Sequence, residues 1–293
     1  MTALLLALIV GTWNGQWFPS GRAEHRAEAK IEARTIQRAG RILRAGLDEI
    51  DPSGKDDVIL CLNEMRDRET VEALCAAIGR TNLTMAIISA YRRRDRYDMQ
   101  QDAIVTTLPV ATAHWSLWKR RRRTVPPRGY AYAEIVVSPA VTSRVYAVHL
   151  KSNYGATTEQ LREDNRAKRS APVEQLLEQE APKRGASAAP VIVAGDFNAD
   201  RWREEFKQET IFTGFEEAGY LNALAALPED ERVTHPSRTF GDSALDYVMM
   251  RGFRQVGKPV IMSADTVSDH WAVFVRAEPD APAEPPKPSR RKK

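Results

Sequence analysis

The sequence contains only two cysteines, Cys61 and Cys75, among its 293 residues. Two cysteines are too few for a disulfide framework, and no Cys-x-x-Cys pair indicates a structural zinc site. Long hydrophobic runs are also missing, because the longest, residues 3–10, has eight residues, whereas a membrane helix needs roughly 20. Neither an internal repeat nor an interdomain linker is visible. These absences exclude a disulfide-rich scaffold, a helical membrane protein and a repeat protein.

The composition, with 43% hydrophobic and 28% charged residues, is typical of a soluble globular chain. We predict one domain over residues 1–276. Residues 277–293 contain five prolines and end in Ser-Arg-Arg-Lys-Lys, so we predict a disordered basic tail there. The apolar start lacks a preceding basic residue and leads directly into Gly11-Thr-Trp-Asn14, which favours a buried first strand over a signal remnant. Both alternatives stay open, so the protein is either cytoplasmic or exported.

Positive charge is concentrated in one part of the chain. The net charge is +4, yet residues 92–128 hold ten Lys and Arg against three acidic residues, a local +7 that leaves 4 − 7 = −3 for the rest. Such local basicity indicates either an anion-binding surface or a solvated loop whose arginines face water.

Hydrophobic periodicity predicts both helices and strands. Apolar residues at helical spacing predict helices over 23–50 and 69–80, and a polar stretch over 158–180 is predicted to be helical but interrupted by Pro172. Short apolar runs predict buried strands at 58–62, 85–89, 103–106, 130–138, 144–151, 191–194, 245–250 and 271–276, after the first strand. Strands outnumber helices, so we predict an α/β or α+β domain with two layers of sheet and helices outside.

Polar side chains of catalytic type stand at the ends of the predicted strands. In chain order these groups are Thr12-Trp-Asn14, Asn63-Glu64-Met-Arg66, His149-Leu-Lys151, Gly195-Asp196-Phe-Asn198, Asp246-Tyr247 and Ser268-Asp269-His270. Each one singly has a structural explanation, such as a turn or a hydrogen-bonded core histidine. All six together favour a site, because rigid strands that open into loops commonly position catalytic groups.

The acidic and amide residues of these groups suit phosphodiester hydrolysis. Mg²⁺ prefers oxygen ligands, which Glu64 and Asp269 can supply. Asp196 can orient and deprotonate a water molecule, while Asn14 and Asn198 can donate hydrogen bonds to phosphoryl oxygens.

The two histidines complete this chemistry. His149 and His270 can each act as an acid or as a phosphate-binding cation. Asp246 can hold the imidazole of His270 in one tautomer, as carboxylates do in other histidine-dependent sites.

The six groups in this order resemble those of the endonuclease/exonuclease/phosphatase superfamily, whose members include DNase I. The resemblance runs from about Val10 to Arg276, and Gly-Asp-Phe-Asn and Ser-Asp-His are its most specific pieces. It implies a DNase I-like, four-layer α/β sandwich, in which two mixed sheets pack face to face with helices on both outer sides. It also implies a phosphoesterase that uses Mg²⁺, with Mn²⁺ or Ca²⁺ as alternatives.

The resemblance further implies roles for single residues. Asn14 is expected near the metal and the phosphate, and Glu64 and Asp269 are expected to bind the metal. The implied catalytic residues are Asp196, which orients the water, Asn198, His270 with its partner Asp246, and a second histidine, His149. Abasic-site endonucleases place a tyrosine at the position of His149, which counts against that branch.

Three further assignments come from single positions. Arg66 resembles the phosphate-contacting arginine of DNase I-like nucleases, and the alternative is an ion pair with Asp67 or Glu69. Lys151, two residues beyond His149 on the same strand, is a second candidate for phosphate binding. Asp102 is a candidate carboxylate partner of His149.

The substrate must be inferred from outside the shared site. The basic segments favour a nuclease that cleaves DNA or RNA by in-line attack of a water activated by Asp196. The alternative is a phosphatase or phospholipase C-type enzyme acting on a phosphoinositide, sphingomyelin or a sugar phosphate. A non-catalytic binding module is disfavoured, because every expected catalytic residue type is present. We expect a monomer that binds nucleic acid and has no stable membrane association.

Overall fold

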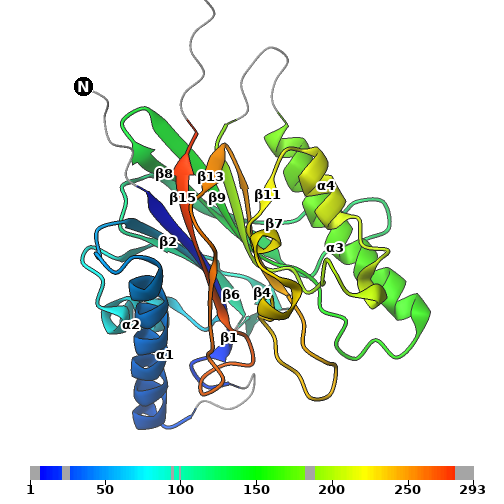
Figure 1. Ribbon diagram of the computed structural model, residues 1–293. Helices are drawn as coiled ribbons and strands as arrows, with labels where there is room; N and C mark the ends of the chain where they lie inside the picture. Colours follow the sequence, from blue (N-terminus) through cyan, green and yellow to red (C-terminus); the bar gives the residue numbers. More distant parts are fainter. Residues whose placement is uncertain (1–6, 22–26, 94–95, 99, 182–188, 281–293) are drawn as a thin grey trace, which may run out of the picture.

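Two mixed β-sheets pack face to face at the centre of the molecule (Figure 1). The structure is a computed structural model that describes residues 7–21, 27–93, 96–98, 100–181 and 189–280. The first sheet has the strand order β13-β15-β1-β2-β6-β3, with β14 beside β15. Its strands are β1 (Leu8–Phe18), β2 (Asp57–Met65), β3 (Thr84–Ile88), β6 (Gln101–Thr106), β13 (Phe253–Gln255), β14 (Val260–Met262) and β15 (Ala272–Pro279).

The second sheet has the strand order β11-β12-β10-β9-β8-β7. Its strands are β7 (Val110–Leu117), β8 (Gly129–Ser138), β9 (Val141–His149), β10 (Val191–Asp196), β11 (Leu221–Asn222) and β12 (Asp246–Arg251). A separate short hairpin consists of β4 (Arg92–Arg93) and β5 (Arg96–Tyr97). The parallel pairs are β1–β2 and β9–β10. Because parallel neighbours need a crossover, a long helix connects each of these two pairs.

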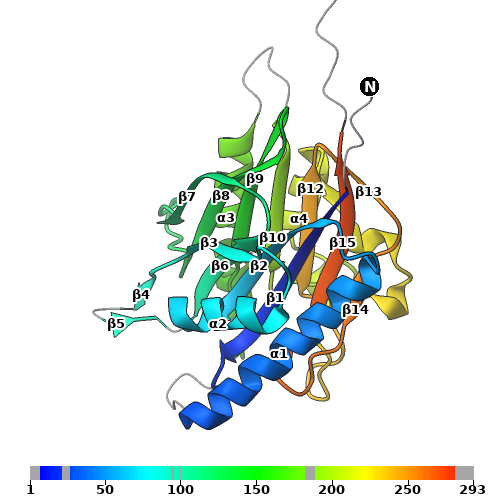
Figure 2. The ribbon, with the colours of Figure 1, turned by 90° about the vertical axis from the view of Figure 1, so that its left-hand side faces the viewer.

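Helices cover the outer face of each sheet (Figures 1 and 2). The first sheet carries α1 (Ala29–Ile50) and α2 (Arg68–Ile78), and the second carries α3 (Glu159–Glu180) and α4 (Ile211–Glu217). Three short 3₁₀ helices cover Glu204–Phe206, Ala223–Ala226 and Glu229–Glu231. The predicted four-layer, DNase I-like sandwich is therefore confirmed. None of the described helices is both long and apolar enough to cross a membrane.

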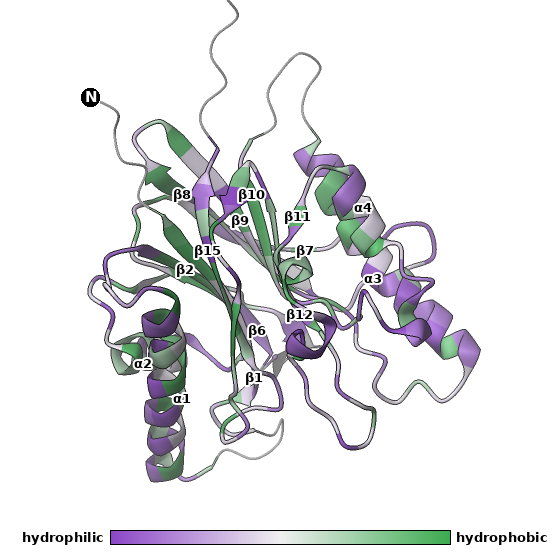
Figure 3. Ribbon diagram, viewed as in Figure 1, coloured by the Kyte–Doolittle hydropathy of each residue, from purple (hydrophilic) through white to green (hydrophobic). Residues whose placement is uncertain are grey.

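The apolar core has two parts, which follow from this layering. One part lies between the sheets and beneath α3 and α4, where Val10, Ile59 and Ile104 of the first sheet meet residues of the second. The other lies between the first sheet and its helices and includes Leu43 and Leu74. The strands are accordingly the most hydrophobic elements, whereas the outer face of α1 is polar (Figure 3).

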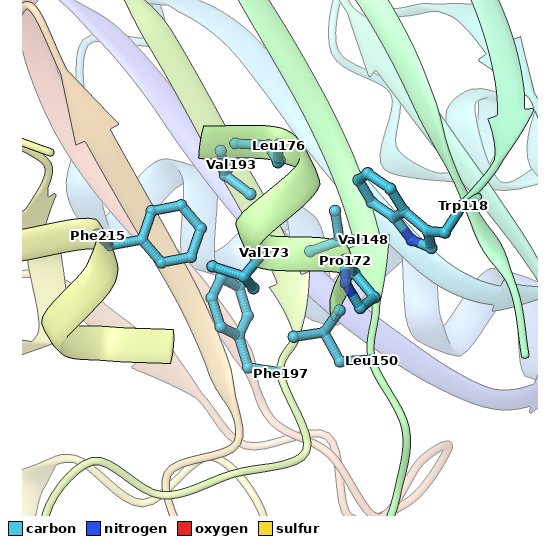
Figure 4. A pocket seen from close by; sticks show the side chains of 9 residues that line it. All are labelled: Trp118, Val148, Leu150, Pro172, Val173, Leu176, Val193, Phe197 and Phe215. Carbon is cyan, nitrogen blue, oxygen red and sulfur yellow. The ribbon is translucent and has the colours of Figure 1, made fainter. Parts of the chain in front are cut away.

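Pro172 does not interrupt α3, contrary to the prediction from the sequence. The helix continues through it, and Pro172 is buried on the face that covers the second sheet. Figure 4 shows how α3 contributes to the packing there, with side chains of Trp118, Val148, Leu150, Pro172, Val173, Leu176, Val193, Phe197 and Phe215 around one another. A proline inside a helix costs about 3 kcal/mol, and burial of this apolar face offsets that cost.

The remaining predicted elements form with shifted ends. The helix expected over 23–50 begins at Ala29, and β9 ends at His149, so Lys151 lies in the following loop rather than on the strand. β15 extends past residue 276 to Pro279. Residues 281–293 of the predicted tail, and residues 1–6 of the predicted first strand, lie outside the described residues. The strands β7, β13 and β14 and the helix α4 are additions that the sequence did not predict.

Candidate active site

Strand register brings the predicted polar residues to one edge of the sandwich. In the first sheet Asn14 lies opposite Asn63, and in the second sheet Asp196 lies between His149 and Asp246. Hydrogen bonds join the two sheets here, and in one of them the backbone N–H of Asp196 donates to Oδ1 of Asn63 at 2.9 Å. The groups predicted at separate strand ends therefore form one cluster.

Asp196 lies at the centre of this cluster and is buried. Its Oδ2 accepts hydrogen bonds from Nδ2 of Asn14 at 3.0 Å and from Nδ2 of Asn198 at 2.8 Å, and its Oδ1 accepts one from the Asn198 backbone at 2.8 Å. Nδ2 of Asn14 also lies 3.3 Å from Oε1 of Glu64. Burial raises the pKa of Asp196 to about 7, although the charge of His270 and these hydrogen bonds oppose the shift.

The backbone around the cluster is strained. Gly195 has φ +149°, and a Cβ atom there would lie 1.9 Å from the carbonyl oxygen of Val148, so only glycine fits. Left-handed backbone also occurs at four non-glycine residues of this edge, namely Gln16, Trp17, Glu64 and Asn198. Residues held in such conformations cost about 1–3 kcal/mol each and cluster at functional sites.

His270 is oriented by a buried carboxylate. Its Nδ1 lies 2.8 Å from Oδ2 of Asp246, which also accepts a hydrogen bond from the Thr234 hydroxyl at 2.8 Å. Burial acts to lower the pKa of His270, but Asp246, Asp196 and Asp269 together outweigh it and raise the pKa to about 10. His270 is therefore cationic at neutral pH, with Nδ1 donating to Asp246 as predicted from the sequence.

The pKa of His149 is shifted in the opposite direction to that of His270. Its Nε2 lies 3.5 Å from Oδ2 of Asp196 and 3.7 Å from Oε1 of Glu64. Burial, followed by the positive charges of Arg128 and His270, keeps the pKa of His149 well below its usual value. The site therefore places a neutral imidazole and a charged one on either side of the same carboxylate.

The expected pairing of His149 with Asp102 is wrong. Both oxygens of Asp102 are occupied, since Oδ1 accepts from Nδ2 of Asn63 at 2.7 Å and Oδ2 from the Tyr91 hydroxyl at 2.9 Å. Nδ1 of His149 is buried and has no hydrogen-bond partner among the described residues. Asp102 instead supports Asn63, the residue that joins the two sheets.

The residues predicted to bind metal fit a hard divalent cation. Glu64 contacts Asn14, and Gln16, two residues further along β1, donates from Nε2 to Oδ2 of Asp269 at 2.8 Å. Oδ1 of Asp269 and Oδ1 of Asp246 are buried, and no hydrogen-bond partner for either lies among the described residues. Carboxylates gathered this closely repel one another unless a cation neutralises them, and Mg²⁺ takes oxygen ligands of this kind. In each of two groups, the ligand atoms lie within 4.8 Å of one another: one group is Asp196, Asp246 and His270, and the other is His235, Asp269 and His270. Glu64 belongs to neither group, so its part in metal binding stays a prediction.

Arg66 forms an ion pair with Asp67, which was the alternative to phosphate binding, and a second, unpredicted pair with Glu32 rather than Glu69. Its Nε lies 2.7 Å from Oδ2 of Asp67, and its Nη1 lies 2.7 Å from Oε1 of Glu32 on α1. Two carboxylates thus share one guanidinium, and the side chain is mostly buried. Its predicted contact with substrate is not among these bonds and stays a prediction.

Lys151 and Arg128 lie on the His149 side of the cluster. Burial, and then the positive charges of Arg128, Lys168 and Arg169, lower the pKa of Lys151. Its Nζ donates to the carbonyl of Ser152 at 2.7 Å. Within the described residues neither Lys151 nor Arg128 forms an ion pair. Nη2 of Arg128 donates a hydrogen bond to Oε1 of Gln100, and the charges of Arg128 and Lys151 both act on His149.

Sequence reasoning missed several residues of this edge. Asn63 is visible in the Asn-Glu motif, but the motif does not reveal its link to the second sheet. Arg128 was counted only as part of a basic segment. Gln16, Thr234 and His235 lie where no periodic pattern guides assignment, although Thr234 and His235 precede the Asp-Tyr motif by about a dozen residues.

Comparison with known proteins supports the fold and identifies the family. The sequence matches the Endonuclease/Exonuclease/phosphatase family over residues 11–270, and no curated protein matches it. Similar solved structures include an endonuclease/exonuclease/phosphatase family protein from Leptotrichia buccalis, with 14% identity, 93% of this chain and 100% of that chain covered, and a TM-score of 0.62.

Two further structures carry more specific names. D. rerio TDP2, solved with a single-strand DNA product, shares 16% identity over 93% of this chain and 99% of that chain, with a TM-score of 0.59. Sphingomyelinase C from Streptomyces griseocarneus shares 16% identity over 92% of this chain and 99% of that chain, with a TM-score of 0.60. At these identities the likeness establishes the DNase I-like fold alone.

The family match covers most of the sandwich, up to the start of β15, and all six predicted groups. Enzymes of this family hydrolyse phosphoester bonds and generally use divalent metal ions. On this match, the chain belongs to the endonuclease/exonuclease/phosphatase family.

Proposed function

We propose that the protein is a metal-dependent nuclease that cleaves DNA, or RNA, by attack of a water molecule on a backbone phosphodiester. The observation that carries this proposal is the positive charge at the His149 end of the second sheet, where Arg128 and Lys151 act on His149. The connection between β7 and β8 lies at the same end of the second sheet as His149, since Tyr130 pairs with Val148. This connection contains four exposed basic residues, Lys119, Arg120, Arg122 and Arg123.

Most of this charge is free to bind an anion. Arg121 pairs with Glu174 and Glu178 on α3. Within the described part of the chain the four exposed basic residues, like Arg128 and Lys151, form no ion pair. Several unpaired cations in a row suit a polymer with one phosphate per nucleotide, because non-specific nucleic-acid binding depends on such contacts. A substrate with one isolated phosphate would leave most of them unused.

The residues of the cluster have the properties that hydrolysis needs. Asp196, with a pKa of about 7, can accept the proton of the attacking water near neutral pH. Cationic His270 can stabilise the negative charge that develops on the phosphoryl oxygens. Asn14 and Asn198 hold the Asp196 carboxylate in place. A divalent ion held by Glu64, Asp269 and Asn14 would supply further neutralisation of the phosphate.

The alternative, hydrolysis of a phospholipid headgroup, is favoured by one observation. Tyr154, in the loop that follows Lys151, is 82% exposed, and Phe240, between Thr234 and Asp246, is 61% exposed. Exposed aromatic residues near a site can contact a lipid surface, although they can equally stack on bases. The structural neighbours include both a sphingomyelinase and a protein solved with single-strand DNA.

Nicking of supercoiled plasmid by the purified protein with Mg²⁺ tests the proposal. We expect nicking that EDTA abolishes and that Asp196→Asn reduces by at least a hundredfold. Arg128→Gln should weaken DNA binding. It should also reduce the slope of the logarithm of the binding constant against the logarithm of salt concentration by about one. Arg254→Gln is the matched control, because Arg254 pairs with Glu278 at the opposite end of β15. Hydrolysis of sphingomyelin or a phosphoinositide without cleavage of plasmid, single-stranded DNA or RNA would refute the proposal.

A further inference from the structure

A histidine outside the family motifs lies beside the catalytic cluster. His235 is bridged to Ser243 at the base of the loop that precedes β12. Its Nε2 lies 3.8 Å from Oδ2 of Asp269, and its ring centre lies 4.8 Å from that of His270. Nε2 of His270 lies 3.9 Å from Oδ1 of Asp269. Two imidazoles and one carboxylate therefore converge at this point.

The hydrogen-bond partners of these groups leave Nε2 of His270 and Oδ1 of Asp269 for an ion, which would take the place of the proton on Nε2. Asp246 binds Nδ1 of His270, and Nε2 of the same ring lies 3.9 Å from both Oδ1 of Asp269 and Oδ2 of Asp196. Gln16 holds Oδ2 of Asp269, whereas Oδ1 is buried and has no hydrogen-bond partner among the described residues. A histidine that binds metal almost always has its other ring nitrogen bonded to a carboxylate or carbonyl, and the Asp246–His270 pair has this arrangement.

The spacing of the three groups is close to that of a transition-metal site. Ligand atoms that bind one tetrahedral Zn²⁺ at about 2.0–2.1 Å lie about 3.3 Å apart. Here Nε2 of His235 lies 3.8 Å from Oδ2 of Asp269, Nε2 of His270 lies 3.9 Å from Oδ1, and one ligand atom of each of the three residues lies within 4.8 Å of the other two. Binding of one ion therefore requires the three side chains to move closer together. The side chains of His235 and Asp269 are 19% and 43% exposed, so an ion can enter from solvent.

We propose that His235, Asp269 and His270 form a second cation site, which binds Zn²⁺ or a similar transition-metal ion. Imidazole ligands suit zinc, cobalt, nickel and copper, whereas Mg²⁺ takes oxygen ligands. The oxygen set of Glu64 and Asn14 is therefore the place for the hard cation, and the imidazole set selects a different class of ion. The two sets share Asp269, so their ions compete.

Occupation of this site inhibits hydrolysis. An ion on Nε2 of His270 occupies the ring nitrogen that lies 3.9 Å from Oδ2 of Asp196. It also takes Asp269 from the oxygen set. Zn²⁺ is therefore an inhibitor of the enzyme in the presence of Mg²⁺, and the site makes the enzyme sensitive to the local concentration of transition metals.

Metal titration of the tag-free, EDTA-treated full chain tests this site without reference to the substrate. Calorimetry should show one Zn²⁺ bound per chain in the presence of Mg²⁺, and Co²⁺ should give visible absorption bands of a four-coordinate site. His235→Gln should raise the dissociation constant for Zn²⁺ at least tenfold, since loss of even an outer partner of a ligand costs about 10–100-fold. His114→Gln is the matched control, because His114 lies on β7 against Tyr132.

Activity gives the second readout. With an aryl phosphodiester as substrate, the Zn²⁺ concentration for half inhibition should rise in His235→Gln by the same factor as the dissociation constant, while activity with Mg²⁺ alone is retained. His235→Asn and thermal unfolding of both variants separate loss of the site from loss of the fold. Zn²⁺ binding that is equally tight in folded His235→Gln, or absent from the wild type, would overturn the proposal.

Discussion

Replacement of Asp246 by Asn removes one negative charge from the site and keeps the shape of the side chain. Asp246 is buried, and its Oδ2 accepts hydrogen bonds from Thr234 and His270 at 2.8 Å each. An asparagine can accept the same two bonds through its amide oxygen. The geometry therefore survives, while the charge that keeps His270 protonated is lost.

The size of the effect follows from the pKa of His270. At a pKa of about 10 the ring is almost fully cationic at pH 7. If the pKa falls to the ordinary value of about 6.5, only about a quarter of the rings are cationic at pH 7, a fourfold loss. Burial pulls the pKa lower still, and the amide NH₂ can turn the ring into the wrong tautomer, an error that costs about 10⁴ in kcat in a serine protease. We therefore expect kcat to fall by about 10²–10⁴.

The assay is kcat at pH 7 together with an NMR titration of the His270 ring. Thr234→Val is the matched control, since it removes the other donor to Asp246 and leaves the carboxylate, and we expect a loss below tenfold. The reasoning fails if Asp246→Asn leaves the pKa of His270 unchanged, or if its kcat stays within a factor of three of the wild-type value.

Three other perturbations have outcomes that the structure determines. Gly195→Ala should lower the free energy of unfolding by at least about 3 kcal/mol in urea denaturation, because its Cβ would overlap the carbonyl of Val148, whereas Gly257→Ala, with positive φ but open space, should cost about 1 kcal/mol. Asp51→Asn should cost about 3 kcal/mol at pH 7, because it breaks a buried pair with Arg80. Burial acts to raise the pKa of Asp51, but hydrogen bonds and Arg80 outweigh it and hold the pKa below its usual value. The stability that Asp51 contributes is therefore present above about pH 4 and is lost as the pH falls. An equal cost of the substitution at pH 3 and pH 7 would contradict the assignment. Removal of metal by EDTA should abolish hydrolysis, and Mg²⁺ should restore it; activity that persists after exhaustive chelation would exclude the metal role.

The sequence predicted the strands that are buried on both faces. Strands buried on both faces, such as β2 and β10, read as continuous apolar runs, so they were located to within a few residues. β7 lies at the edge of its sheet with most residues exposed, so its sequence carries no comparable signal. Pro172 was misjudged for a related reason, because the cost of a proline is local while the packing that offsets it comes from β9 and β10.

The site was predicted to the extent that its residues belong to short motifs. His270 and Asp269 stand next to each other, and Asp196 is two residues from Asn198, so these residues were found together. The pairing of His149 with Asp102 was predicted wrongly, because a carboxylate 47 residues away can be assigned only when its own hydrogen bonds are known. His235 had no motif at all, and only the folded loop brings it to Asp269.

Asn63 shows why the site depends on the packing of the sandwich. Its side chain accepts from the backbone of Asp196 in the other sheet and donates to Asp102, which Tyr91 holds on its far side. A shift of one residue in β2 would turn Asn63 to the opposite face of its sheet, which would break the link and move Glu64 away from Asn14. The position of the water-activating carboxylate relative to the metal ligands is therefore set by strand register, and the catalytic geometry is a property of both sheets together.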